Sequence, residues 1–258
     1  MLAVERRSQI EKLILQNKSV LVLELAKKFD VTTETIRGDL EKLEKQGILV
    51  RTYGGATLVE ANEADMALVE RETINYEGKH RIGSYAARLI KDGETIFLDA
   101  STSSLHVAQS IKEKRGITVI TNAARVATEL AGCDNIRVIS TGGLLTAKNM
   151  SYVGRVAEEN IRKNYYANKF FFSCRGVTLH RGLMEANEGE AEIKKAMMEC
   201  SESSILLCDH KKLGRLGVHM VAGLNMIDYF ITDVKLDEEW SDALAQNDVN
   251  LITVEGGE

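Results

Sequence analysis

The stretch from Val20 to Thr57 constrains the fold of this chain more than any other part of the sequence. Its letters are VLVLELAKKFDVTTETIRGDLEKLEKQGILVRTYGGAT. A short apolar helix is predicted first, with Leu23, Leu25, Ala26 and Phe29 among its residues, and it stops before Thr32. A second helix then begins, with Thr32 or Thr33 as the side chain that caps its free N–H groups. This spacing suits a reading helix set across a short positioning helix.

The second helix has an apolar and a polar face. Ile36, Leu40 and Leu43 follow the i, i+4, i+7 spacing of a stripe that faces a domain core. Since an α-helix turns by about 100° per residue, the outward positions can be assigned. They are Glu34, Gly38, Glu41 and Lys45, with Arg37 and Lys42 on the flanks. We expect this outward face to lie in a DNA major groove.

A β-hairpin is predicted directly after that helix. Gly47 ends the helix, and residues 48–52 have the β-branched content of a strand. Gly54 and Gly55 then turn the chain back, which gives the hairpin wing of a winged helix-turn-helix. The residues expected to contact DNA are Thr33, Thr35, Arg37, Gly38, Lys42, Lys45, Arg51 and Tyr53.

Charge is distributed unevenly along the chain. The formal net charge is −5, which argues against DNA as a partner because phosphate neutralisation supplies most non-specific affinity. Residues 1–51, however, carry ten Lys and Arg against eight Asp and Glu, so the remaining residues hold the whole negative excess. A mildly basic head on an acidic body fits a DNA-binding regulator with a separate sensing domain, and ordinary solvated surface charge is the alternative that so small an asymmetry leaves open.

Three segments are expected. Residues 1–58, which include a first helix over residues 3–17, form the DNA-binding head, and the polar, acidic residues 59–76 form a linker. Residues 77–258 form a larger domain, because predicted strands and helices alternate from residue 95 onward. That order predicts an α/β fold with a mainly parallel sheet and helices on both faces.

The chain offers little sign of a membrane span or of metal chemistry. No apolar run approaches the roughly 20 residues of a membrane helix, and the first residues lack a secretory apolar core, so a cytoplasmic protein without membrane association is expected. Four scattered cysteines without a C-x-x-C motif favour buried, reduced thiols over a metal site or a disulfide. The five histidines form no pair with metal-ligand spacing, and no G-x-S-x-G turn occurs. We therefore expect no metal, no cofactor and no catalytic residues.

Polar residues follow the predicted strands of the larger domain. Since ligands bind beyond the carboxyl ends of strands in open α/β sheets, these residues are candidates for a binding site. The first strand is followed by a hydroxyl-rich turn that opens a helix, and free N–H groups there suit a phosphate, although a serine that merely caps the helix explains the turn as well. The candidates at strand ends are Asp99, Ser101, Thr102, Ser103, Thr121, Asn122, Gly142, Gly143 and Arg175.

Further candidates lie around the start of a later helix and after a buried strand. Glu185 precedes that helix, and Glu190 and Lys194 lie four residues apart on it, where a simple ion pair within the helix is the alternative. Asp209 and Lys212 follow the next strand, and a solvated surface lysine is the alternative for Lys212.

The head resembles a known family. The run ELAKKFDVTTETIRGDLEKLEKQGILVRTYGGA is similar, without gaps, to the DNA-binding signature of the DeoR family of bacterial regulators of sugar metabolism. Two positions depart from the family pattern. Gly38 replaces a second arginine, and Tyr53 replaces a histidine of the wing. Neutral drift at a solvated position and close approach of the backbone to DNA both explain Gly38.

The larger domain resembles the sensor domain of the same family, which is related in fold to ribose-5-phosphate isomerase, glucosamine-6-phosphate deaminase and CoA-transferase. The family's D-x-G-T-T loop matches residues 99–103, where Ser101 replaces the usual glycine, and its T-N, G-G and D-x-x-K elements match Thr121–Asn122, Gly142–Gly143 and Asp209–Lys212. The resemblance implies a phosphorylated sugar as effector, double-stranded operator DNA as partner, and a homo-oligomer.

Three functions are therefore weighed. The first is a sequence-specific transcriptional regulator, by resemblance a repressor of a sugar catabolic operon, that responds to a sugar phosphate. The second is a sugar-phosphate isomerase or deaminase, for which Glu190, Asp99 or Asp209 would serve as the base. It is disfavoured because a DNA-reading head has no catalytic use. The third is a DNA-architectural protein indifferent to sequence and metabolites.

Overall fold

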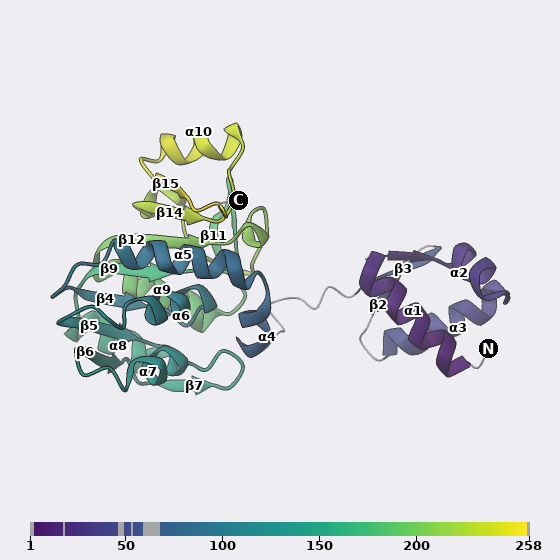
Figure 1. Cartoon of the computed structure of the whole chain (residues 1–258), viewed down its shortest axis with the longest axis horizontal. Coiled ribbons are helices and arrows are strands. Elements are labelled where there is room, and N and C mark those ends of the chain that lie inside the picture. The colour runs from purple at the N-terminus through teal and green to yellow at the C-terminus, as the bar shows by residue number, and fades with distance from the viewer. Residues whose placement is uncertain (1–2, 18, 46–48, 53, 59–67, 257–258) are drawn as a thin grey trace. The chain divides into compact units, whose positions relative to one another are not determined.

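The protein folds as two compact units, Met1–Asp65 and Met66–Glu258, shown in Figure 1. The computed structural model describes residues 3–17, 19–45, 49–52, 54–58 and 68–256. Each unit has its own apolar core, so each is described by itself.

The first unit contains three helices and a small antiparallel sheet. The helices are α1 (Ala3–Asn17), α2 (Val22–Phe29) and α3 (Thr33–Lys45), and the sheet has the order β1 (Ser19–Leu21), β3 (Gly55–Leu58), β2 (Leu49–Thr52). The apolar stripe of α3 is confirmed, since Ile36, Leu40 and Leu43 are buried in the core of this unit. Strands β2 and β3 form the expected hairpin. The fold is therefore a winged helix-turn-helix, to which β1 adds a third strand that the sequence analysis did not predict.

The residues predicted for the first short helix all lie in α2, although one of them faces solvent. Leu23 is 69% exposed, and Val22 takes the inward position beside Leu25, Ala26 and Phe29. The helix begins at Val22, and its buried stripe consists of Val22, Leu25, Ala26 and Phe29. The predicted helix end at Gly47 and the wing residue Tyr53 lie outside the described residues, as does the side chain of Lys45.

The second unit is built on a seven-stranded sheet in which every neighbouring pair of strands is parallel. The strand order is β15 (Asn250–Thr253), β14 (Tyr229–Thr232), β12 (Ser201–Cys208), β9 (Ala167–Phe172), β4 (Thr95–Leu98), β5 (Ile117–Thr121), β6 (Ile136–Ser140). The expected α/β class with a mainly parallel sheet is thus confirmed.

Two sets of helices cover the two faces of this sheet (Figure 1). Helices α5 (Tyr76–Arg88), α6 (Thr102–Ser110) and α7 (Ala124–Leu130) pack on one face, against side chains such as Ile96 and Leu98. Helices α8 (Arg155–Asn164), α9 (Glu188–Glu199) and α10 (Glu238–Gln246) pack on the other, against Phe97 and its neighbours. Since successive side chains of a strand alternate between faces, the consecutive residues Phe170, Phe171 and Phe172 supply both cores.

Several short elements were not predicted. They are α4 (Leu68–Thr73), the hairpin of β7 (Leu144–Thr146) and β8 (Ser151–Val153), helix α8, and a second antiparallel sheet of β10 (Gly176–Thr178), β11 (Gly182–Glu185) and β13 (His219–Ala222). Most are three or four residues long, too short to show a hydrophobic period, and α8 buries only Ala157 and Ile161. Over the described ranges, the helices are too short or too polar to span a lipid bilayer.

The structure gives Gly38 no steric reason to be glycine, so we expect Gly38→Ala to stabilise the head. A Cβ atom at Gly38 would meet no atom within 4 Å, and glycine inside a helix costs about 1 kcal/mol relative to alanine. Calorimetry of the full chain should show that the free energy of unfolding of the head rises by about 1 kcal/mol in this variant.

Gly83→Ala is the matched control in the second unit. There the new Cβ would lie 2.5 Å from His106 Cβ and 2.9 Å from the backbone nitrogen of Val107, so α5 and α6 would have to separate. We expect a loss of about 1–3 kcal/mol from overpacking. An unchanged or destabilised head in Gly38→Ala would contradict the assignment of residue 38 to an open helix surface.

Candidate functional site

The carboxyl edge of the parallel sheet contains a point where the chain reverses its direction of strand addition. From β4 the chain adds β5 and β6 on one side, and it later adds β9, β12, β14 and β15 on the other. The switch therefore lies between β4 and β9. Ligands in open α/β sheets bind in the crevice outside the carboxyl ends of the strands at such a point. Asp99 follows β4 there, and Ser173 follows β9.

Asp99 organises the loop that opens α6. Its carboxylate is fully buried, and Oδ1 accepts hydrogen bonds from the backbone N–H of Ser101 at 3.1 Å and the hydroxyl of Ser104 at 2.5 Å. Oδ2 accepts from the backbone N–H of Ser173 at 3.2 Å, across the switch point. Ser101 in turn caps α6 by accepting from the backbone N–H of Ser104 at 3.1 Å. The capping interpretation of Ser101 is thus correct, and Asp99 joins β4, β9 and α6.

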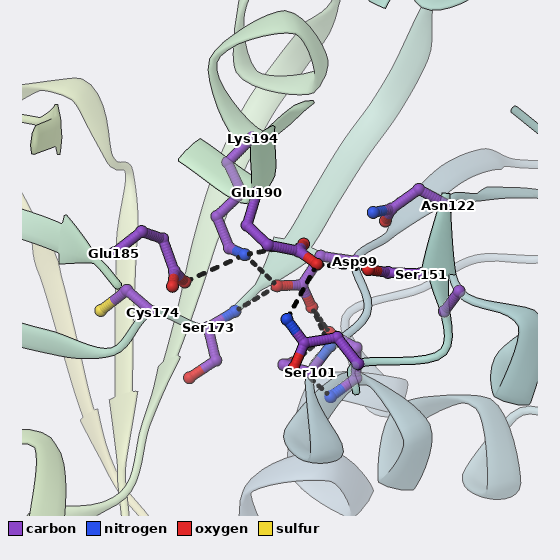
Figure 2. A network of polar contacts seen from close by, with 12 residues as sticks. Asp99, Ser101, Asn122, Ser151, Ser173, Cys174, Glu185, Glu190 and Lys194 are labelled. Carbon is purple, nitrogen blue, oxygen red and sulfur yellow. Dashed lines mark hydrogen bonds and ion pairs between the residues drawn. The ribbon is translucent and has the colours of Figure 1, made fainter. Parts of the chain in front are cut away.

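Lys194 reaches Asp99 from α9 on the opposite face of the sheet (Figure 2). Its Nζ lies 3.2 Å from Asp99 Oδ2 and 3.0 Å from Glu185 Oε1, and 4.0 Å from Glu190 Oε2. Burial alone lowers the pKa of this ammonium, but the three carboxylates reverse that effect and raise its pKa well above the usual range. Glu190 and Lys194 are therefore more than an ion pair within one helix, because the closer partners of Lys194 come from other elements.

Glu190 is the second buried carboxylate of the network. One of its oxygens, Oε1, accepts hydrogen bonds from the hydroxyl of Ser151 and from Asn149 Nδ2, the latter at 3.1 Å. Both donors belong to the β7–β8 hairpin. In Figure 2 the side chains of Ser151 and Asn122 approach the network from the same side, while Glu185 lies on the other.

Two polar groups continue the rim toward β12 and β14. Lys212 Nζ donates to Ser173 Oγ at 2.6 Å and lies 3.7 Å from Asp209 Oδ2. Beside it, Asp233 accepts from the backbone N–H of His210 and pairs with the His210 ring at 2.9 Å. Burial raises the pKa of Asp233, but hydrogen bonds from Asn75 and His210 outweigh burial and lower it overall. The predicted residues Asp209 and Lys212 thus join the Asp99 network through Ser173.

Three of the buried polar atoms at this rim that lack a hydrogen-bond partner among the described residues belong to predicted site residues. They are Ser103 Oγ, Asn122 Oδ1 and Asp209 Oδ2, which follow β4, β5 and β12. All three side chains are at most 1% exposed. A buried polar group without a partner is costly, so these atoms identify a place where a polar ligand would recover hydrogen bonds.

The remaining predicted residues have backbone or packing roles in this structure. Thr121 donates its hydroxyl to the carbonyl of Leu98 at 2.6 Å and so ties β5 to β4. Gly143 has φ +109°, and a Cβ there would lie 2.8 Å from the Val153 carbonyl oxygen. Thr102 is buried at the first position of α6, Gly142 has φ +65°, and the backbone N–H of Arg175 donates to Met184. None of these contacts assigns the residues to a ligand.

The head presents the expected surface on α3. Glu34, Arg37, Gly38 and Lys42 are exposed, and Arg37 pairs with Glu34 at 3.4 Å. Thr32 is the cap, since its Oγ1 accepts from the backbone N–H of Thr35 at 3.3 Å, and Thr33 and Thr35 are half-buried.

Strand β2 is fixed to α3 by Arg51. Its backbone N–H and guanidinium both donate to the carboxylate of Glu44, at 3.0 and 2.7 Å. The pKa of Glu44 is lowered, first by the backbone hydrogen bond from Arg51 and then by the side-chain bond. Arg51 therefore holds the wing in place as well as offering charge.

Sequence reasoning missed several residues of these sites. Asp39 of α3 is buried and pairs with Arg6 at 2.5 Å and Arg7 at 3.3 Å, which fixes α1 against α3. In the second unit, Ser173, Ser151, Asn149 and the Asp233–His210 pair were not predicted. Ser173 and Asp233 had a usable signal, because each directly follows a strand of the parallel sheet.

The cysteines and histidines build no reactive centre in the part of the chain that the structure describes. All four cysteines are free, and burial raises the pKa of the Cys174 thiol to about 12. No three His, Cys, Asp or Glu residues among residues 3–256, outside the undescribed gaps, are grouped to hold a metal ion.

A winged head joined to an α/β body with a polar carboxyl edge defines a two-domain DNA-binding regulator with a ligand-sensing domain. Comparison with known proteins specifies the class. Residues 6–62 match the model of the DeoR-like helix-turn-helix domain, and residues 74–234 match that of the DeoR C terminal sensor domain. The chain therefore belongs to the DeoR family of transcriptional regulators.

The relatives align over nearly the whole chain. An uncharacterized HTH-type transcriptional regulator, YulB of Bacillus subtilis, is 40% identical over 98% of both chains. The HTH-type transcriptional regulator GolR of Listeria innocua is 34% identical over 92% of this chain and 93% of its own. A putative aga operon transcriptional repressor of Escherichia coli O157:H7 is 31% identical over 97% and 93%. Among solved structures, ribose 5-phosphate isomerase A of Methanocaldococcus jannaschii aligns with 54% of this chain and 55% of its own at 15% identity, with a TM-score of 0.41.

Lys194→Met should destabilise the sensor unit by about the same amount at every pH between 5 and 8. The variant leaves Asp99, Glu185 and Glu190 without their shared cation, and breaking a buried ion pair costs about 3–5 kcal/mol. Because the folded-state pKa of Lys194 lies above its unfolded value, the wild-type contribution is fully present below that unfolded value, near 10.4, and is lost only as the pH rises through the folded value. It is therefore constant between pH 5 and 8.

The loss in the variant should accordingly be the same at pH 6, 7 and 8, because Lys194 stays protonated in the wild type over this range. Thermal unfolding at several pH values measures this difference. Lys195→Met is the control on the neighbouring position, since its pair with Glu192 is more than a third exposed and should contribute less than about 1 kcal/mol. A loss in Lys194→Met no larger than that in Lys195→Met would contradict the role of the buried charge.

Proposed function

We propose that this chain is a repressor of a sugar catabolic operon, and that a phosphorylated sugar bound at the carboxyl edge of the sheet alters its affinity for the operator. The observation that carries the proposal is the set of three buried polar atoms without hydrogen-bond partners, Ser103 Oγ, Asn122 Oδ1 and Asp209 Oδ2, the last of which has only the ammonium of Lys212 at 3.7 Å. They follow separate strands but meet one edge of the sheet. Family membership supplies the DNA-binding context.

The start of α6 suits the phosphate group. The first N–H groups of a helix have no acceptor within it, and the helix dipole favours an anion there. Ser101 already satisfies the N–H of Ser104, so the N–H groups of Thr102 and Ser103 are the donors for a ligand. Lys212 supplies a cation nearby through its contact with Ser173, and Arg175 follows the adjacent strand.

The carboxylates and the amide suit the sugar. Asn122 Oδ1 and Asp209 Oδ2 are acceptors, so they require donors such as sugar hydroxyls. Glu190 and Glu185 add further acceptors held in place by Lys194. A neutral polyol carrying one phosphate therefore fits the mixture of cationic, N–H and carboxylate groups better than a polyanion does.

The head would read the operator through the exposed side of α3 and the wing. Arg37, Lys42, Lys45, Arg51 and Tyr53 would supply contacts to phosphate or bases, with Thr33 and Thr35 at the start of the helix. We propose a homo-oligomer, because one small head offers little contact area and paired heads read two half-sites. The proposed domain limits remain 1–58, 59–76 and 77–258.

The proposal is tested by incubating the full-length protein with a panel of pentose and hexose phosphates and the matching free sugars. We expect one phosphorylated sugar to raise the melting temperature without being converted, since binding only the folded state adds about 2.7 kcal/mol at a ligand concentration 100 times Kd. Turnover of any panel member would sink the sensor proposal and restore the isomerase or deaminase alternative.

A pair of neighbouring serines makes the test specific. Ser103→Ala removes a hydroxyl that has no partner, so it should weaken ligand binding roughly tenfold while leaving stability unchanged or slightly higher. Ser104→Ala removes a hydroxyl that donates to Asp99, so it should lower stability by about 1–3 kcal/mol. Undiminished ligand affinity in Ser103→Ala would place the phosphate elsewhere.

Arg37→Ala tests the reading face of the head. If Arg37 contacts phosphate, operator affinity should fall with a shallower salt dependence; if it contacts guanine, base preference at one position should relax at a cost of about 1–3 kcal/mol. Binding to duplexes selected by the wild type from random DNA measures both. Lys28→Ala on α2 is the exposed control, and unchanged binding by Arg37→Ala would remove Arg37 from the interface.

A further inference from the structure

Helix α4 (Leu68–Thr73) is the first described element after residues 59–67, which connect it along the chain to the head. The turn between β7 and β8 holds it in two places. The backbone N–H of Leu68 donates to the carbonyl of Lys148 at 3.0 Å, and Arg71 Nη2 donates to Asn149 Oδ1 at 2.8 Å. The position of α4 therefore depends on that turn.

The same asparagine also contacts the candidate effector site. Asn149 Nδ2 donates to Glu190 Oε1 at 3.1 Å, and Glu190 is 4% exposed and lies beside Lys194. The orientation of the amide follows from chemistry, since a guanidinium can only donate and a carboxylate can only accept. One side chain thus bridges α4 and the buried network.

We infer that Asn149 is a positioning residue that transmits occupancy of the effector site to α4, and through α4 to the segment that carries the head. The inference rests on the proposed function, because it takes the effector to bind beside Glu190. It adds the route by which binding is communicated. The contacts that form the route are Arg71 to Asn149 and Asn149 to Glu190.

Glu190 Oε1 has no room for a third donor. A carboxylate oxygen has two lone pairs, and Ser151 and Asn149 already use them. A ligand hydroxyl that binds this oxygen must therefore displace one of the two. Ser151 is held in β8 and also hydrogen-bonds to Thr146 at 2.9 Å, whereas Asn149 lies in the turn. Asn149 is the donor that yields, and Arg71 then loses a fixed acceptor.

Such a device meets the thermodynamic condition for a switch. A ligand shifts an equilibrium only as far as its affinities for the two states differ. Here the ligand competes for a hydrogen bond that exists in one state alone, so the two states differ at the binding site itself. The hydrogen bond from Asn149 to the Glu190 carboxylate is charge-assisted, so breaking it costs more free energy than breaking a neutral hydrogen bond.

The test measures amide hydrogen exchange of residues 68–73 in the full-length protein without any ligand. Glu190→Gln should accelerate exchange in α4 by about threefold or more, because the charged acceptor of Asn149 is lost. Asn149→Asp should do the same, because it places two carboxylates face to face. The double variant Asn149→Asp/Glu190→Gln reverses donor and acceptor and restores both bonds, so exchange should return to within about twofold of the wild type.

Arg125→Ala is the matched control. Arg125 of α7 pairs with Glu72 of α4 at 3.3 Å, outside the Glu190 network. Loss of this ion pair should accelerate amide exchange in α4. Adding Glu190→Gln to Arg125→Ala should accelerate exchange further and should not restore the wild-type rate. If Asn149→Asp does not fold, Arg71→Ala serves instead, since Glu190→Gln should then no longer change exchange in α4.

Failure of the double variant to restore protection, or an unchanged α4 in Glu190→Gln, would overturn the inference. Because the experiment contains no ligand, its outcome is independent of whether a sugar phosphate binds. Conversely, a panel in which no sugar phosphate binds would reject the proposed function while leaving a measured link between Glu190 and α4 intact.

Discussion

The buried contact between Asp99 and Lys194 is the interaction on which the sensor unit depends. It joins the loop after β4 to α9, which lies on the other face of the sheet, at the point where the strand order reverses. Removing an ammonium from water is expensive unless charge and hydrogen bonds compensate for it. Three carboxylates provide that compensation, and each then needs donors of its own. The serines, the asparagine and the backbone N–H groups around the edge supply them.

This requirement explains why so many polar groups meet at one edge. The backbone N–H groups of Ser101 and Ser173 donate to Asp99, because its buried carboxylate needs hydrogen bonds in addition to its pairing with Lys194. Preorganised polar groups of this kind cannot relax without disturbing the sheet. The sugar phosphate that we propose as effector would therefore meet fixed donors and acceptors, which favours discrimination between sugars that differ at one hydroxyl.

Much of the fold could be predicted because its strands and helices are long enough to show a pattern. Polar residues at strand ends, such as Asp99, Asn122 and Asp209, could be predicted because parallel strands end at one edge. Asn149 and Ser151 could not, since they lie in a hairpin whose strands have only three residues each and whose place beside α9 depends on tertiary contacts alone. The burial of Asp39 had no signal either, because its partners Arg6 and Arg7 come from another helix and were counted as free positive charge.

The three consecutive phenylalanines of β9 have a consequence for the protein outside its native state. Phe170, Phe171 and Phe172 are fully buried, two facing one core and one facing the other. An unfolded chain exposes all three in one short segment of high β propensity, which is the composition that nucleates intermolecular sheets. Lys169 precedes the segment and Arg175 closely follows it, and flanking charges of this kind oppose such pairing. Any loss of stability in this unit is therefore expected to appear first as aggregation and reduced yield of the protein in cells.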